Sequence, residues 1–157
     1  MPRADRPTSS PDGAADADRR PRVLFVCVKN GGKSQMAAAL MRHHAGDEVD
    51  VHSAGTRPGT AINAQSAEAI AEVGADMSSA VPQPVTPELL RSVDHVIVIG
   101  DEAVIKPVEG MTAPVTTWHT DEPSQRGIEG MERMRLVRDD IDTHVRKLLT
   151  DLTGTAN

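Results

Sequence analysis

A single cysteine opens a short polar segment near the start of the chain, CVKNGGKS at residues 27–34. Its two glycines, Gly31 and Gly32, can adopt positive φ angles, which let the backbone N–H groups of a loop converge on one point. Convergent N–H groups followed by a lysine and the start of a helix suit a tetrahedral oxyanion. Lys33 and these N–H groups would also favour the thiolate form of Cys27. The segment therefore predicts a nucleophilic thiolate beside an oxyanion site.

Two other interpretations of this segment are open. Residues 32–34 match the end of the nucleotide-binding pattern GxxxxGK[ST], but Cys27 stands where that pattern has its first glycine. Asp101 is the one acidic residue placed after a buried strand where it could bind magnesium. In the second interpretation, Cys27 is a buried structural thiol and the rest is a plain strand-to-helix turn. The glycine pair, the lysine and Ser34 together favour the oxyanion site.

The overall composition restricts the function classes. The 157 residues carry a net charge of −6, and aromatic residues make up 1% of the chain. A nucleic-acid partner is not expected, because a basic excess and stacking side chains are both missing. No apolar run approaches a membrane span and no apolar leader precedes residue 22, so we expect a cytoplasmic protein with no membrane partner. His43 and His44 are adjacent on a helix and point apart, and we expect no metal site.

The cysteine count restricts the redox chemistry. Cys27 is the only cysteine in the sequence. The chain can therefore form neither an internal disulfide nor a relay of cysteines. Any reductive step at Cys27 would need a thiol from outside the chain.

Strands and helices alternate from residue 22 onward. Apolar runs predict buried strands at 22–26, 49–53, 94–100 and 114–118. Ser34 is a candidate N-cap for the helix after the polar loop, and Thr86 before Pro87 is a candidate N-cap for a later one. A helix over 63–73 is predicted to end before Gly74, and one apolar stripe predicts a long helix over 131–152.

This alternation predicts an α/β domain with a four-stranded parallel sheet and helices on both faces. Ligands of such sheets bind at the carboxyl ends of the strands, where the 27–34 loop lies. Residues 1–21 contain no leucine, isoleucine, valine or aromatic side chain, and we expect a disordered N-terminal tail. The domain is expected to span 22–152, with a flexible C-terminus at 153–157.

Four segments resemble a known family. Cys27-x5-Lys33-Ser34 after the strand VLFV resembles the C-x5-R-[ST] loop of the low-molecular-weight protein tyrosine phosphatases and the related arsenate reductases. The segment SAGT at 53–56 resembles the one after the second strand of that family. Glu122-Pro123 stands where the family has an Asp-Pro loop with its general acid, and VRDDI at 137–141 resembles the C-terminal helix. The resemblance covers residue 22 to about residue 149.

Within that family the chain most resembles the arsenate–mycothiol transferases, which share its single cysteine, the NGGKSQMAA run and a Glu-Pro loop before GMERMR at 130–135. The resemblance implies that arsenate is bound by Lys33 and the backbone of Val28, Lys29, Asn30, Gly31 and Gly32. Catalysis would fall to Cys27, to Ser34 as donor to its thiolate, and to Glu122 as acid, with Asp121 as the second candidate. It further implies no bound cofactor, mycothiol as co-substrate, and a mycoredoxin-like protein that releases arsenite.

Three departures from the phosphatase pattern bear on activity. Lys33 replaces an arginine, so the two parallel hydrogen bonds of a guanidinium are missing. Glu122 replaces an aspartate and has a longer reach. Ser124 and Gln125 stand where the phosphatases have tyrosines that wall an aryl pocket. These changes predict weak phosphatase activity, although a phosphomonoesterase and a non-catalytic oxyanion binder stay open as alternatives.

Overall fold

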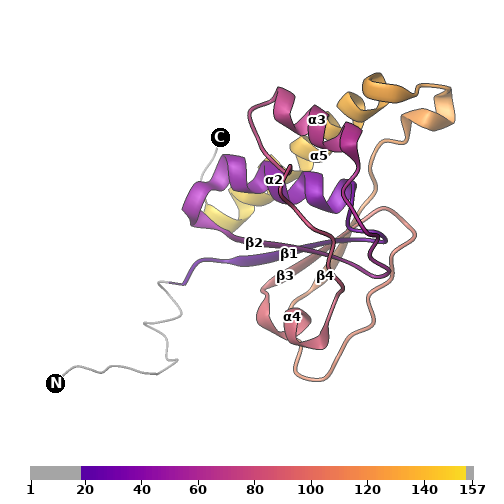
Figure 1. Ribbon diagram of the computed structural model, residues 1–157. Coiled ribbons are helices and arrows are strands. Elements are labelled where there is room, and N and C mark those ends of the chain that lie inside the picture. The colour runs from indigo at the N-terminus through magenta and orange to yellow at the C-terminus, as the bar shows by residue number, and fades with distance from the viewer. Residues whose placement is uncertain (1–18, 155–157) are drawn as a thin grey trace.

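The computed structural model describes residues 19–154 of the chain (Figure 1). Its four strands are β1 (Arg22–Cys27), β2 (Asp50–Gly55), β3 (His95–Ile99) and β4 (Val115–Trp118). Its helices are α2 (Lys33–Ala45), α3 (Ala64–Glu72), α4 (Pro87–Ser92) and α5 (Gly130–Thr153), with short 3₁₀ turns η1 (Gly46–Glu48) and η2 (Pro123–Arg126).

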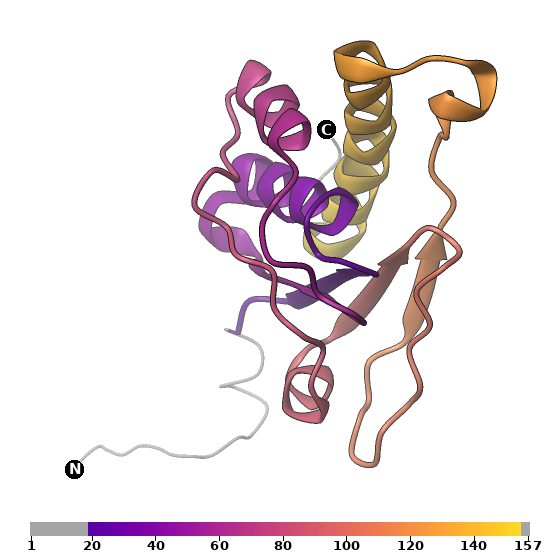
Figure 2. The same cartoon turned by 45° about the vertical axis from the view of Figure 1, so that its right-hand side comes forward.

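The strands form one parallel sheet in the order β2-β1-β3-β4. In the register of this sheet Cys27 at the end of β1 lies opposite Gly55 at the end of β2. All four carboxyl ends meet at one edge, which Figure 2 shows from a second side. The predicted four-stranded parallel sheet is confirmed.

Helices cover both faces of the sheet, as predicted, but unequally. Helices α2, α3 and α5 lie on one face, and α4 lies on the other (Figure 1). Each face of the sheet carries a hydrophobic core, and successive residues of β1 contribute to the two cores alternately. Val23 and Phe25 belong to the larger core, and Leu24 and Val26 belong to the smaller one. All four are fully buried, which explains why this strand is a continuous apolar run.

The predicted stripe on the last helix faces the larger core. The predicted stripe consists of Met131, Met134, Val137, Ile141, Val145, Leu148 and Leu152, of which Met134, Val137, Ile141 and Val145 are buried and the other three are partly exposed. Leu149, which the stripe did not include, is buried in the larger core. Burying five such side chains against α2 and α3 removes a large apolar area from water, and this holds the long helix in place.

Several element bounds differ from the predicted ones. Strand β2 continues through Ala54 and Gly55, because these residues pair with Val26 and Cys27 of β1. The segment at 83–85 also pairs with the end of β2: Gly55 donates to the carbonyl of Gln83 and accepts from the N–H of Val85. Ser34 is not the N-cap of α2, and that prediction is wrong: the helix begins at Lys33 with Gly32 at the cap, and Ser34 is buried inside the first turn.

Most of the predicted N-terminal tail and the last three residues lie outside the described residues. Arg19 and Pro21 are described, and both contact the domain: the Arg19 guanidinium donates to Asp94, and the Pro21 carbonyl accepts from the N–H of Asp50. At the other end, α5 continues through Thr153 and is followed by Gly154 in the left-handed conformation.

Two arginines of α5 form ion pairs with the last residue of α3. Glu72 accepts hydrogen bonds from Arg135 and Arg138, and these hydrogen bonds lower the pKa of Glu72 from 4.5 to about 2. A carboxyl with a lowered pKa contributes stability above its unfolded pKa and loses it as the pH falls through the folded value. We therefore expect the protein to lose stability between about pH 4.5 and pH 2. In urea unfolding across this range, Glu72→Gln should flatten that slope, and an unchanged slope would contradict the assignment.

Candidate active site

The 27–34 loop lies at the carboxyl edge of the sheet, between the end of β1 and the first turn of α2. The sequence suggested that Gly31 and Gly32 would adopt the positive φ angles of this loop, but the structure places the positive φ elsewhere. Asn30 adopts it, with φ of 55°, while Gly31 and Gly32 do not. Gly31 is required for another reason: a Cβ there would lie 2.9 Å from the carbonyl oxygen of Ala61.

The carbonyl groups of this loop point away from its centre. Those of Cys27, Val28, Lys29 and Gly31 accept hydrogen bonds from backbone N–H groups of the segment that follows β2, at residues 56, 57, 59 and 63. The carbonyl and N–H of one trans peptide point in opposite directions. The N–H groups of the next residues therefore face inward, as an oxyanion site needs.

The Cys27 sulfur lies among hydrogen-bond donors. Ser34 Oγ is 3.0 Å from Cys27 Sγ, and the Asn30 N–H donates to the sulfur at 3.3 Å. Asn30 Nδ2 donates to Ser34 Oγ at 2.8 Å, and because a thiolate can only accept, the Ser34 hydroxyl would donate its own hydrogen to Cys27 in the thiolate form. Ser34 thus lies where it was expected to act, although not as a helix cap.

The orientation of Asn30 is fixed by residues that the sequence analysis missed. Its side-chain oxygen accepts from the N–H of Gln83 at 2.9 Å and from Gln35 Nε2 at 3.2 Å, so its NH₂ group must face Ser34. Asn30 is fully buried. Gln83 is 53 residues away along the chain. Its place in this network depends on the pairing of its segment with β2, which no local pattern indicates.

Gly55 lets the two loops meet. A Cβ on Gly55 would lie 2.5 Å from the Val28 carbonyl oxygen and 3.0 Å from the Asn30 nitrogen. Real Cβ atoms do not approach backbone this closely, so only glycine fits here. The SAGT segment at 53–56 thus packs against residues 27–34, which we call the oxyanion loop.

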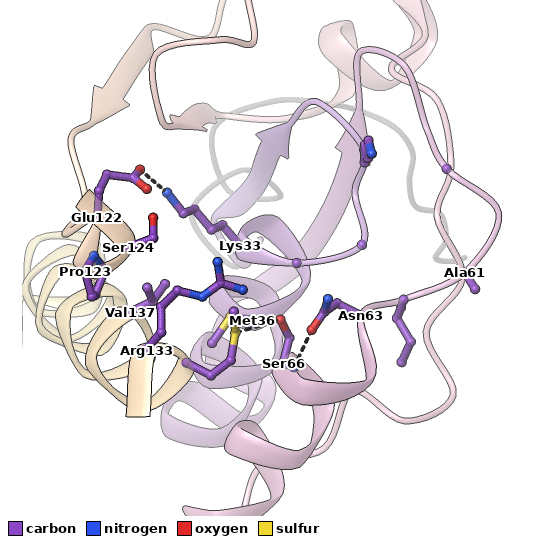
Figure 3. A pocket seen from close by; sticks show the side chains of 16 residues that line it. Lys33, Met36, Ala61, Asn63, Ser66, Glu122, Pro123, Ser124, Arg133 and Val137 are labelled. Carbon is purple, nitrogen blue, oxygen red and sulfur yellow. Dashed lines mark hydrogen bonds and ion pairs between the residues drawn. The ribbon is translucent and has the colours of Figure 1, made fainter. Parts of the chain in front are cut away.

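Lys33 and Glu122 face each other across the site. Lys33 Nζ donates to Glu122 Oε2 at 2.6 Å, although the two residues are 89 positions apart (Figure 3). About half of the Glu122 side chain is exposed, at 46%. Glu122 therefore lies within reach of an oxyanion bound at Lys33.

Asp121, the second candidate acid, is held elsewhere. Both of its oxygens accept from Arg126, which lowers the pKa of Asp121 and keeps the carboxylate charged. Its backbone N–H donates to Asp140 Oδ2 on α5, which anchors the segment before η2. Asp121 is thus turned to Arg126, whereas Glu122 lies beside Lys33 of the loop, and this position favours Glu122.

A cavity of roughly 460 Å³ adjoins the loop (Figure 3). Gly31, Gly32 and Lys33 form its rim, whereas Cys27 does not line it. Side chains of α2, α3 and α5 form its walls, and Lys29 and Glu122 border it. The cavity therefore shares part of its lining with the oxyanion loop but does not include Cys27.

Residues 19–154 contain no group of three or more His, Cys, Asp or Glu side chains arranged to hold a metal ion. Among these residues no helix combines the length and the apolarity that crossing a bilayer requires.

Several known proteins are similar to this chain in sequence or in fold. A putative arsenate reductase of Halobacterium salinarum is 31% identical over 140 residues, covering 86% of this chain and 95% of that protein. An arsenate reductase of Bacillus licheniformis is 30% identical over 131 residues, covering 80% and 92%. The solved thioredoxin-dependent arsenate reductase of Corynebacterium glutamicum superposes with a TM-score of 0.73 at 33% identity, covering 89% of this chain and 65% of that one.

The sequence pattern of one family spans almost the whole described domain. Residues 22–156 match the family described as low molecular weight phosphotyrosine protein phosphatase. The match agrees with the four segments singled out in the sequence and with the loop at the carboxyl edge of the sheet. The chain belongs to the low molecular weight phosphotyrosine protein phosphatase family, and its sequence relatives within that fold include arsenate reductases.

Proposed function

We propose that this protein is an arsenate reductase that passes arsenic from Cys27 to an external low-molecular-weight thiol, mycothiol. The proposal rests on one arrangement: the only cysteine of the chain lies in a loop whose N–H groups face inward, with Ser34 and Asn30 at its sulfur. Relatives described as arsenate reductases support the substrate. The family resemblance of the sequence suggests mycothiol.

The first step joins arsenic to the protein. The loop N–H groups and the Lys33 ammonium hold arsenate, and the Ser34 hydroxyl stabilises the Cys27 thiolate. The thiolate attacks arsenic, an S–As bond forms, and one arsenate oxygen leaves as water after Glu122 supplies the proton. Arsenic stays in the +5 state during this step.

The next two steps need partners, because the sequence holds no second cysteine. A mycothiol thiolate attacks the arsenic and displaces Cys27, which gives a thiol–arsenate adduct and regenerates the enzyme. A cysteine of a mycoredoxin-like protein then attacks the mycothiol sulfur. A disulfide forms, the electron pair of the broken S–As bond stays on arsenic, and arsenite is released.

The test is arsenite production from arsenate in three parallel reactions: with mycothiol and mycoredoxin, with thioredoxin, and with no thiol. Arsenite in the first reaction alone is the expected result. Turnover with thioredoxin alone would instead place this chain with the Corynebacterium glutamicum neighbour, which is described as thioredoxin-dependent. Hydrolysis of para-nitrophenyl phosphate without any arsenite would indicate a phosphatase, and oxyanion binding without turnover a non-catalytic binder.

The acid is assigned by two matched variants. Glu122→Gln keeps the size of the side chain but removes the proton, and we expect kcat to fall on the order of 100-fold. Asp121→Asn should change kcat less than about 10-fold, because both Asp121 oxygens are paired with Arg126. Steady-state arsenite production measures both. The reverse order of effects would make Asp121 the acid.

A further inference from the structure

The cavity beside the oxyanion loop contains a buried donor that has no partner. Arg133, on the first turn of α5, points into this cavity in Figure 3. Its Nε is buried and donates no hydrogen bond to any described residue. Its Nη1 lies 3.6 Å from Glu129 Oε1, which is a loose ion pair. A buried N–H without an acceptor costs free energy, so this geometry suits an acceptor brought by a ligand.

The rest of the cavity defines what kind of ligand that would be. Its floor is apolar, formed by Met36, Ile62, Met134 and Val137. Lys29, Lys33 and Arg133 bring three positive charges, against the single carboxylate of Glu122. The ligand should therefore have acceptor oxygens for the charged side chains and C–H faces, such as those of a sugar ring or an acyl group, that pack on the two methionines.

The position of the cavity points to its role in the reaction. It shares Gly31, Gly32 and Lys33 with the oxyanion loop, yet Cys27 does not line it. Arsenate held by the loop would thus be reached from this side by a second reactant. That second reactant is the external thiol that the single cysteine makes necessary.

We propose that this cavity binds the external thiol, and that Arg133 is a specificity-determining residue that hydrogen-bonds an acceptor oxygen of that thiol through Nε. This inference rests on the proposed function, since it assumes an external thiol. The acceptor could be an amide carbonyl or a carboxylate, and both occur in small biological thiols. The thiol sulfur would then face the arsenic held at the loop.

The test uses unreactive analogues, so that binding is measured apart from chemistry. S-methylmycothiol and S-methylglutathione are titrated by calorimetry into the whole protein. We expect at least one to bind, and Arg133→Met to weaken that binding roughly tenfold or more, the loss of one hydrogen bond from a charged donor. Arg146→Met, a surface change on the same helix at the Asp142 ion pair, should leave it unchanged.

A second variant tests the cavity without touching Arg133. Ala61 is exposed on its rim, so Ala61→Phe should fill space and weaken binding while the protein melts normally. In turnover, both variants should raise the KM for the thiol and leave the KM for arsenate unchanged.

Failure of this inference and failure of the proposed function are distinguishable. If neither analogue binds, or if binding is equal in wild type and Arg133→Met, the cavity does not hold the thiol, whatever the arsenite assay gives. If binding depends on Arg133 but no arsenite forms with any thiol, the thiol site stands and the proposed function is wrong.

Discussion

Cys27→Ser should abolish arsenite production, with a loss of at least about 1,000-fold. Serine is almost isosteric with cysteine, but its hydroxyl stays protonated and is a much weaker nucleophile. The neighbouring donors, the Ser34 hydroxyl and the Asn30 N–H, remain in place in this variant. The measurement is arsenite formed per minute with saturating thiol.

Binding provides the control for this prediction. The loop N–H groups and Lys33 are unchanged in Cys27→Ser, so phosphate or arsenate should still bind, as calorimetry can measure. Thermal melting should also be near that of the wild type. If the variant kept more than a tenth of the wild-type rate, Cys27 would not be the nucleophile, and the external thiol would have to attack bound arsenate directly.

Asn30→Ala should damage both stability and turnover. The variant loses the amide that donates to Ser34 Oγ and accepts from Gln83, and it places alanine at a φ of 55°. An unsatisfied buried donor costs about 1–3 kcal/mol, and left-handed alanine costs about a further 1–2 kcal/mol. We expect a loss on the order of 3 kcal/mol in the free energy of unfolding, measured in urea.

The effect on rate follows from the hydrogen-bond chain to the sulfur. Without the Asn30 amide, the Ser34 hydroxyl loses the hydrogen bond that holds it beside the Cys27 sulfur. A hydrogen bond to a charged group contributes about 1.5–3 kcal/mol, which corresponds to roughly 10- to 100-fold in kcat.

Two further variants of Asn30 separate the causes. Asn30→Gly removes the same hydrogen bonds but suits a positive φ, so it should recover the conformational part of the stability and none of the rate. Asn30→Asp keeps the acceptor for Gln83 and offers the Ser34 hydroxyl a carboxylate, so it should fold better than Asn30→Ala and remain slow. A fast Asn30→Asp enzyme would contradict the role of Ser34 as donor to the thiolate.

Much of the fold was determined by local patterns in the sequence. The buried run VLFV, the stripe on the last helix and the alternation of strands and helices each report burial, because apolar periodicity follows the period of the element. The position of Cys27 and its polar loop, directly after the first strand, was predicted from the same kind of local pattern. Parallel connectivity then places this loop at the carboxyl edge of the sheet, where all four strands end.

The tertiary structure decided how the site is assembled. The sequence could not distinguish Asp121 from Glu122 as the candidate acid, since they are neighbours of similar chemistry. In the structure Asp121 pairs with Arg126, whereas Glu122 pairs with Lys33 of the loop. The left-handed residue of the loop is Asn30 and not a glycine, and its side chain accepts a hydrogen bond from the N–H of Gln83.

The sequence predicts the fold better than the assembly of the site because the two depend on interactions of different range along the chain. Periodicity records what a residue shares with positions three or four places away, and it fixes which side of an element is buried. The pairs that make this site span 53 and 89 residues, and they exist only once β2 has paired and α5 has packed against α2. Local sequence thus positions the thiol and its loop, whereas long-range packing brings Glu122 to Lys33 and fixes the side chain of Asn30 near the sulfur.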